Sequence, residues 1–204
     1  MMGRIVYIHG LGQDAGAWKE TAACVDYEGV FPDLAKLCEG EAVCYKTLSR
    51  RFEEYCGAED GKLVLCRLSL GGILAMDYAI RHPDRVDRLI LAGIQYRMPA
   101  RLLRFQNFLF RLMPESAFPG SGFGKMDFIS LSRSMTELDF TDELKKIECP
   151  ALVICGEKDS ANQTACKEAA GLLPDGRLCV IQGAGHELNC SHPKELAEAI
   201  TKFI

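Results

Sequence analysis

Short runs of consecutive apolar residues recur along the chain, each bounded by Gly, Pro or polar residues. Runs of four to eight apolar residues with this punctuation are typical of strands buried on both faces of a sheet. The run at 27–31 is the weakest, and Pro32 closes it. We expect strands at residues 4–8, 27–31, 62–67, 86–93, 151–156 and 177–181.

Between these runs the apolar residues follow a helical period. Helices are expected at residues 15–24, 45–57, 163–173 and 193–203, and a further helix begins near Leu70 and ends before Pro83. Buried strands that alternate with helices predict an α/β fold of three layers, in which a mostly parallel sheet lies between two layers of helices.

Residues 97–148 interrupt this alternation because they show helical patterns and no strand. A segment of this length between two strands of a sheet is typical of a cap over a functional site. The prediction is therefore a single domain over 1–204, with 97–148 as a helical cap insert. The expected sheet begins directly at the amino terminus, which corresponds to a core that lacks additional N-terminal strands.

Composition limits the function. Of 204 residues, 48% are hydrophobic and 25% are charged, which excludes a wholly disordered chain. Lys and Arg number 24 against 28 Asp and Glu, and the net charge of −4 argues against nucleic acid as a partner. No stretch reaches the roughly 18 apolar residues of a transmembrane helix.

The chain has ten cysteines, and no two of them are separated by only two residues. This spacing provides neither a CxxC redox pair nor a zinc knuckle, so we expect no metal site. Cys66 and Cys155 lie inside apolar runs, where cysteine is a small buried hydrophobe. No signal peptide precedes the first expected strand, and reduced thiols fit a cytoplasmic protein.

Ser69 provides the sharpest local signal. It lies in the stretch CRLSLGG, between an expected strand and an expected helix. A serine on such a turn can project its hydroxyl above the sheet edge, where the helix N-terminus supplies unpaired N–H groups. The alternative is that Ser69 is only the N-cap of the helix, a position that serine favours.

A nucleophilic serine needs a base and an orienting acid. Among the four histidines, His186 lies in the glycine-rich loop GAGHE after an expected strand, whereas His82 and His192 each precede a proline. Asp159 in CGEKD follows another strand end, and Glu157 is its rival. Strand ends of a parallel sheet share one edge, which is where sites collect.

In this order, HGLGQ, LSLGG, GEKD and GAGH make the chain resemble the α/β-hydrolase superfamily of serine hydrolases. The resemblance covers nearly the whole chain. It implies that Ser69 is the nucleophile, His186 the general base and then acid, and Asp159 the orienting carboxylate. It also implies an oxyanion hole from the backbone N–H groups of Leu11 and Leu70.

The implied reaction is hydrolysis of a small or medium carboxylic ester, or a related acyl compound, through an acyl-enzyme on Ser69. No metal or cofactor is implied, and the partner is a small-molecule substrate with an apolar part. The resemblance gives His9 a supporting role in its loop, without proton transfer.

One position departs from the family's Gly-x-Ser-x-Gly turn, because Arg67 stands at its first glycine. Two interpretations stay open: the turn accommodates Arg67, or Arg67 impairs catalysis and the protein binds a ligand without turnover. If Arg67 is only a blemish, Arg67→Gly equals or exceeds the parent's esterase activity.

A dinucleotide site is a further alternative. The run from Gly10 to Ala15 fits G-x-G-x-x-G/A, and Asp33 follows about twenty residues later. That interpretation leaves LSLGG, GEKD and GAGH unexplained.

Residues 97–113 form an amphipathic pattern within the expected cap. Four arginines share one face, and the other face carries Leu102, Leu103, Phe105, Leu109 and Phe110. The apolar side chains of this helix could line an acyl pocket while the arginines steer an anionic substrate or touch a membrane surface. The plain alternative is a cap helix with a solvated basic face. Further apolar residues over the site are expected from Phe118, Phe123, Met126, Phe128 and Ile129.

Overall fold

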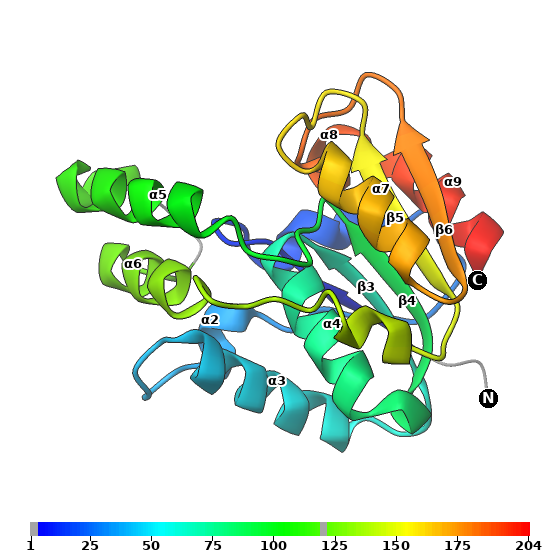
Figure 1. The fold of residues 1–204 in the computed structure, drawn as a ribbon. Coiled ribbons are helices and arrows are strands. Elements are labelled where there is room, and N and C mark those ends of the chain that lie inside the picture. Colours follow the sequence, from blue (N-terminus) through cyan, green and yellow to red (C-terminus); the bar gives the residue numbers. More distant parts are fainter. Residues whose placement is uncertain (1–3, 119–121) are drawn as a thin grey trace.

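A computed structural model describes residues 4–118 and 122–204. Its centre is one six-stranded sheet in the order β2-β1-β3-β4-β5-β6, and every neighbouring pair of strands is parallel (Figure 1). The strands are β1 (Ile5–Ile8), β2 (Gly29–Val30), β3 (Leu63–Leu68), β4 (Val86–Ala92), β5 (Ala151–Gly156) and β6 (Gly176–Ile181).

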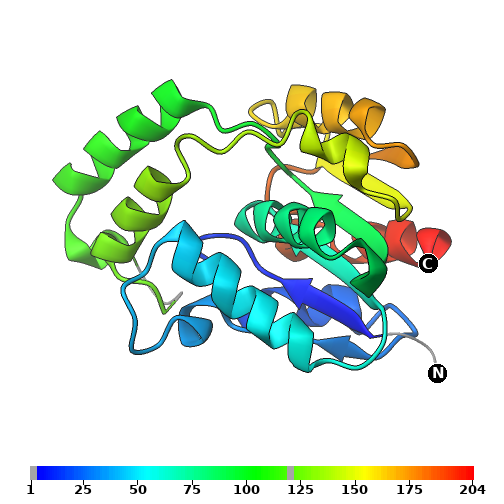
Figure 2. The same ribbon diagram turned by 60° about the horizontal axis from the view of Figure 1, so that its bottom comes forward.

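Helices cover both faces of the sheet, and this is why β1, β3 and β5 are buried along their whole length and, apart from Arg67 in β3, apolar without alternation. One face packs against α2 (Leu34–Leu37), α3 (Tyr45–Ala58), α4 (Leu70–Arg81) and α7 (Gln163–Leu172). The other face packs against η1 (Ala15–Trp18), α1 (Lys19–Ala22), α8 (Leu188–Ser191) and α9 (Pro193–Phe203). Figures 1 and 2 show the two layers, and the predicted three-layer α/β fold is confirmed.

Two predicted elements are shorter in the structure. The helix expected at 15–24 is a 3-10 turn followed by one turn of α-helix, because the Asp14 carboxylate accepts from Gly16 N (2.7 Å) and tightens the start. The strand expected at 27–31 pairs only at Gly29 and Val30, since it lies at the sheet edge.

Two short α-helices, α2 and α8, were not predicted. The Asp33 carboxylate caps α2 by accepting from Ala35 N (3.0 Å) and Lys36 N (3.2 Å). Asp33 is the acidic residue that a dinucleotide site would use for a ribose, and here its side chain serves the helix.

The segment between β4 and β5 extends away from the sheet (Figures 1 and 2). Its described residues contain α5 (Ala100–Leu112), η3 (Glu115–Ala117), α6 (Lys125–Ser134) and η4 (Glu143–Lys146). We call residues 97–148 the inserted segment. Arg97, its first residue, pairs with Asp139 in an isolated antiparallel bridge, where Met98 N donates to Leu138 O (2.9 Å) and Phe140 N donates to Tyr96 O (2.9 Å).

The cysteines are free, and Cys66 and Cys155 are buried in the sheet as predicted. Burial raises the pKa of Cys56 and Cys166 to about 12. Within 4–118 and 122–204, no three His, Cys, Asp or Glu side chains are grouped so that they could hold a metal ion. No helix in the same residues is long and apolar enough to cross a bilayer.

Candidate active site

Ser69, Asp159 and His186 follow β3, β5 and β6, so that parallel strands bring all three to one edge of the sheet. Ser69 and His186 line one cavity of about 380 Å³, and Asp159 is bonded to His186. The chain adds β2 on one side of β1 and β3 on the other, so the strand order reverses between β1 and β3. The cavity lies at the ends of these two strands, where parallel sheets typically form a crevice that binds ligands.

Ser69 connects β3 directly to α4 in a strained backbone conformation. With φ 51° and ψ −113°, it is the one residue other than glycine with positive φ in the described part of the chain. Ser69 N donates to Ala92 O (3.0 Å), and Gly72 N donates to Ser69 O (2.8 Å), so both sides of the turn are fixed. Such strain persists only where the surroundings impose it, and it is concentrated at functional sites.

The N-cap alternative for Ser69 can be compared with this geometry. Ser69 does occupy the N-cap position of α4, but its hydroxyl makes no capping hydrogen bond within the described residues. Ser69 is instead one of the residues that line the cavity.

Gly71 allows the turn to lie close to the sheet. A Cβ on Gly71 would lie 2.8 Å from Ile8 Cγ2 and 2.9 Å from Ile8 O. Only a residue without a side chain therefore fits where the first turn of α4 crosses the end of β1.

Asp159 and His186 form a hydrogen-bonded pair in which the aspartate is buried and the imidazole is partly exposed. His186 Nδ1 lies 2.8 Å from Asp159 Oδ2, and the Asp159 side chain is 4% exposed. With Nδ1–H donating to the carboxylate, Nε2 keeps its lone pair, which is the tautomer that a general base needs.

Asn162 is a third member of this group that the sequence did not reveal. Its Nδ2 lies 2.8 Å from Asp159 Oδ1 and 3.0 Å from Oδ2. Burial opposes ionisation of Asp159, but the hydrogen bonds from His186 and Asn162 outweigh it and hold the pKa of Asp159 below its usual value. The carboxylate thus stays charged beside the imidazole. An amide three residues after an aspartate carries no distinctive sequence signal.

Gly93, directly after β4, makes room for the pair. Its φ is 55°, and a Cβ at this position would lie 2.9 Å from His186 Nδ1 and 3.4 Å from Asp159 Oδ2. The sequence places Gly93 only at a strand end, so this contact between distant loops could not be predicted from it.

The rival acid and the remaining histidines lie elsewhere. Glu157 Oε2 accepts from Gly183 N (2.8 Å) and makes no bond to His186 within the described residues. His82 Nε2 lies 2.9 Å from Glu53 Oε1 beyond the C-terminus of α4, and His192 is the N-cap residue of α9.

His9 is fully buried and fixes the loop after β1. Its Nδ1 donates to Gly10 O (2.9 Å), and its Nε2 accepts from Leu34 N (3.1 Å). Burial lowers the pKa of His9, so the ring stays neutral. Both nitrogens are thus engaged with the backbone, which leaves none for proton transfer.

The two expected oxyanion donors border the cavity. Leu11 follows the buried His9-Gly10 pair, Leu70 is the first residue of α4, and both residues line the cavity with Ser69. Neither backbone N–H donates to another group within residues 4–118 and 122–204. Two unengaged N–H groups next to a nucleophile can stabilise the charge of a tetrahedral intermediate.

Arg67 is accommodated without opening the turn. Its side chain is fully buried in the layer between the sheet and α3, where Nη1 donates to Val6 O (2.8 Å) and Cζ lies 4.7 Å from the centre of the Phe52 ring. Nε and Nη2 are buried without a partner in the described residues. Burial lowers the pKa of Arg67 to about 10.

The cavity is mainly apolar, and the inserted segment supplies much of its wall. Leu103 and Phe110 from α5 and Phe128 from α6 line it, as expected for an acyl pocket. Phe105 and Leu109, expected on the same side, are instead 58% and 41% exposed. Met126 is 69% exposed and is not among the residues that line the cavity.

A sequence model described as "Alpha/beta hydrolase family" matches residues 5–199. Among curated proteins, the chain is 23% identical to the putative carbamate hydrolase RutD of Escherichia coli O17:K52:H18 over 231 residues, covering 93% of this chain and 82% of that protein. It is 24% identical to the biotin biosynthesis bifunctional protein BioHC of Teredinibacter turnerae, covering 98% of this chain and 44% of BioHC. The chain thus spans less than half of that bifunctional protein.

Solved structures share the fold. An esterase from Thermogutta terrifontis superposes with a TM-score of 0.79 at 23% identity, covering 98% of this chain and 90% of the esterase. The enol-lactonase from Burkholderia xenovorans LB400 gives a TM-score of 0.82 at 19% identity, covering 100% of this chain and 91% of the lactonase.

Proposed function

The chain belongs to the alpha/beta hydrolase family, and from that premise we propose that it hydrolyses a small or medium carboxylic ester through an acyl-enzyme on Ser69. One observation carries the proposal. The 2.8 Å pair of His186 and Asp159 ends at the same cavity as a serine held at φ 51°.

In the proposed reaction, His186 Nε2 takes the Ser69 Oγ proton while Oγ attacks the ester carbonyl carbon. The N–H groups of Leu11 and Leu70 stabilise the negative oxygen of the tetrahedral intermediate. His186 then gives its proton to the departing alcohol, and the acyl group remains on Ser69. Water repeats the attack with His186 as base, which releases the acid and restores the serine.

Asp159 orients the imidazole of His186 and stabilises its protonated form in this cycle. Its carboxylate, held ionised by His186 and Asn162, stabilises the imidazolium that forms twice in each turnover. It needs no proton of its own at any step.

The proposed substrate has an apolar part. The cavity volume of about 380 Å³ lies in the range of sites for small molecules, and aliphatic and aromatic side chains make up most of its wall. The names carbamate hydrolase, esterase and enol-lactonase among the relatives describe cleavage at a carbonyl carbon next to oxygen or nitrogen. We propose residues 1–204 as one domain, with 97–148 as the cap that closes this cavity.

The test is labelling with a serine-directed fluorophosphonate, combined with hydrolysis of p-nitrophenyl esters. We expect the parent to be labelled and Ser69→Ala to lose both labelling and at least about 10⁴-fold in turnover. Ser191→Ala is the matched control, because Ser191 is exposed and bonded to Glu187 O. Absence of labelling in the folded parent would contradict the proposal and favour a ligand-binding protein without turnover.

A series of p-nitrophenyl esters of increasing acyl length then measures how long an acyl chain the cavity accommodates. We expect kcat/KM to rise with each added methylene until the chain fills the wall formed by Leu103, Phe110 and Phe128, and then to fall. Equal rates for all lengths would contradict an acyl site in this cavity.

A further inference from the structure

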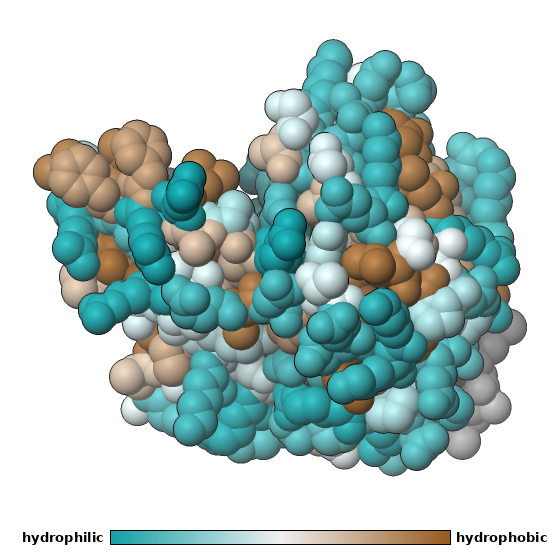
Figure 3. All heavy atoms as spheres, viewed as in Figure 1, coloured by the Kyte–Doolittle hydropathy of each residue, from teal (hydrophilic) through white to brown (hydrophobic). Residues whose placement is uncertain are grey.

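Helix α5 exposes a large apolar surface to solvent. Its exposed apolar side chains are Leu102 (56%), Phe105 (58%), Phe108 (57%), Leu109 (41%) and Leu112 (68%). Asn107 is the single buried residue of the helix. Figure 3 shows apolar side chains gathered at the projecting end of the molecule where α5 lies in Figure 1. Contiguous exposed apolar surface of this kind marks a docking site.

At about 100° per residue, α5 presents three faces in sequence around its axis. Leu103, Gln106 and Phe110 face the cavity of Ser69. The exposed apolar residues follow, and Leu102 belongs to both sets because it lines the cavity while 56% of it is exposed. The apolar surface therefore runs to the rim of the cavity.

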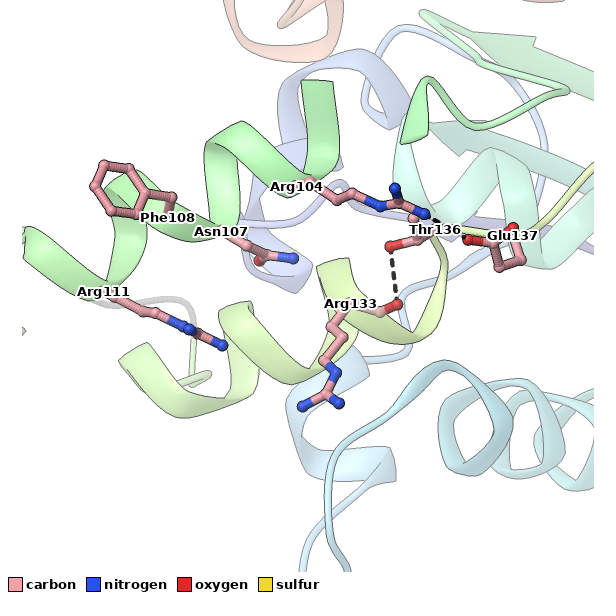
Figure 4. Close-up of a pocket in the computed structure, with 7 residues that line it drawn as sticks. All are labelled: Arg104, Asn107, Phe108, Arg111, Arg133, Thr136 and Glu137. Atoms are coloured by element: carbon pink, nitrogen blue, oxygen red, sulfur yellow. Dashed lines mark hydrogen bonds and ion pairs between the residues drawn. The ribbon is translucent and has the colours of Figure 1, made fainter. Parts of the chain in front are cut away.

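The third face of α5 borders a basic groove against α6. The groove has a volume of about 390 Å³, and Arg104, Arg111 and Arg133 line it together with Asn107 and Glu137 (Figure 4). Glu137 pairs with Arg104 at 3.2 Å. Arg111 and Arg133 have no carboxylate partner within the described residues, and Figure 4 shows the Arg111 side chain extending from α5 toward α6.

Asn107 adds an unsatisfied polar group to this groove. The residue is 9% exposed, and its Oδ1 is buried without a hydrogen-bond partner in the part of the chain described. Its amide projects between α5 and α6 in Figure 4. A buried amide oxygen normally accepts a hydrogen bond, so a ligand hydroxyl or other donor in the groove would satisfy Asn107 Oδ1.

Charge decides which occupant fits the surface. The chain has a net charge of −4, but residues 97–113 contain four arginines and neither Asp nor Glu. A second copy docked symmetrically on this face would bring the arginines of both copies together, and the groove of each copy offers only Glu137, already paired with Arg104, as a carboxylate. A bilayer with anionic headgroups complements both the apolar side chains and the arginines.

We propose that α5 and the adjoining groove dock the protein on an anionic lipid surface. Phe105, Phe108 and Leu112 enter the acyl region, Arg111 and Arg133 bind the phosphate of a lipid headgroup, and Asn107 Oδ1 accepts from a headgroup hydroxyl. The cavity rim at Leu102 then faces the bilayer. Delivery of a lipid-borne ester to Ser69 rests on the proposed function, whereas docking itself does not.

The test is sedimentation with vesicles of phosphatidylcholine alone and of equimolar phosphatidylcholine and phosphatidylglycerol. We expect binding to the anionic vesicles only, with a steep loss as salt is raised. The variant Phe105→Ser/Phe108→Ser/Leu112→Ser should weaken binding at least about tenfold, since each side chain contributes buried apolar area. None of these three residues lines the cavity of Ser69.

A second variant separates the headgroup groove from the apolar surface. Arg111→Gln/Arg133→Gln should remove the preference for phosphatidylglycerol and flatten the salt dependence. The matched control is Arg177→Gln/Leu178→Ser on β6, which removes one exposed charge and one exposed apolar side chain away from α5 and should bind like the parent.

Three outcomes would overturn the proposal: no vesicle binding by the folded parent, equal binding to neutral vesicles, or equal loss in the β6 control. Dimerisation through this face, shown by a doubled mass that the serine triple variant abolishes, would assign the surface to a second copy instead. Ser69→Ala should bind vesicles like the parent, so that failure of hydrolysis and failure of docking are told apart.

Discussion

The carboxyl edge of the sheet and helix α5 are built in opposite ways. At the sheet edge, His186, Asp159 and Asn162 hold one another by hydrogen bonds, and Gly93 leaves only enough space for them. In α5, all of whose residues the structure describes, Asn107 alone is buried. Substitutions should therefore act on stability and chemistry at the sheet edge, and mainly on association at α5.

The arginines show the same difference. Arg67 is fully buried and fixed by Val6 O and the Phe52 ring, whereas Arg104 is mostly exposed and pairs with an exposed glutamate. A buried cation without a carboxylate partner is costly, while an exposed ion pair contributes little.

The largest expected effect is that of Arg67→Gly. Removing this side chain leaves a cavity between β3 and α3, and we expect the free energy of unfolding to fall by about 2–5 kcal/mol. The esterase activity of the folded fraction should equal or exceed that of the parent, because the side chain points away from the cavity of Ser69. Urea unfolding and activity at low temperature measure the two quantities.

Arg67→Met is the matched control for this change, since it keeps most of the volume and removes the buried charge. It should unfold at equal or higher denaturant concentration than the parent. If Arg67→Gly proves as stable as Arg67→Met, the volume of the side chain does not contribute to the free energy of unfolding, and the expected cavity effect is wrong.

Gly93→Ala should be next in size. The new Cβ would crowd His186 Nδ1 at a backbone conformation with positive φ, and displacing the imidazole by about 1 Å should lower kcat/KM about a hundredfold. Steady-state kinetics on a p-nitrophenyl ester measure the loss. In the control Gly171→Ala, the Cβ enters open space within α7 and activity should stay at the parent's value.

The pH dependence of stability gives a smaller effect. Burial lowers the pKa of His9 in the folded protein. Below about pH 6.5, His9 of the unfolded chain therefore binds a proton, while the buried ring of the folded protein stays neutral. Stability is then lost as pH falls, by at most about 1.4 kcal/mol per pH unit for this one group. His9→Gln should flatten the urea-unfolding profile between neutral pH and about pH 5; an unchanged slope would mean that His9 is not buried neutral.

The smallest effect is expected in α5. Phe105→Ser removes a side chain that is already 58% exposed, so the free energy of unfolding should change by no more than about 0.5 kcal/mol. If thermal or urea unfolding shows that Phe105→Ser lowers the free energy of unfolding by several kcal/mol, the side chain is packed against another part of the protein. Helix α5 and the sheet edge would then not differ in the way described.

The sequence predicted what local chemistry determines. The long strands were recognisable because both of their faces are buried, and the turn at Ser69 because strand, serine and glycines are adjacent. His186 and Asp159 were singled out as strand-end residues, and their 2.8 Å contact follows from parallel strands ending at one edge.

The rest depends on contacts between distant residues. Gly93 and Asn162 matter only through the imidazole that folds against them, and the stretches around them show no motif. The position of Arg67 depends on Phe52 and Val6, which come from other elements. Periodicity also predicted an apolar side for residues 97–113, but not how much of that side the body of the protein covers.

The bridge between Arg97 and Asp139 has a consequence for how such a protein changes over generations. Backbone hydrogen bonds hold Tyr96 and Met98 next to Phe140 and Leu138. The two points at which the segment joins the rest of the protein therefore stay at the same distance from each other, whatever residues lie between them. Loop-closure entropy grows only slowly with length, by about 0.6 kcal/mol per doubling. The stretch between the bridged residues is thus an exchangeable part, which can be lengthened or replaced over generations without altering the sheet edge that carries Ser69 and His186.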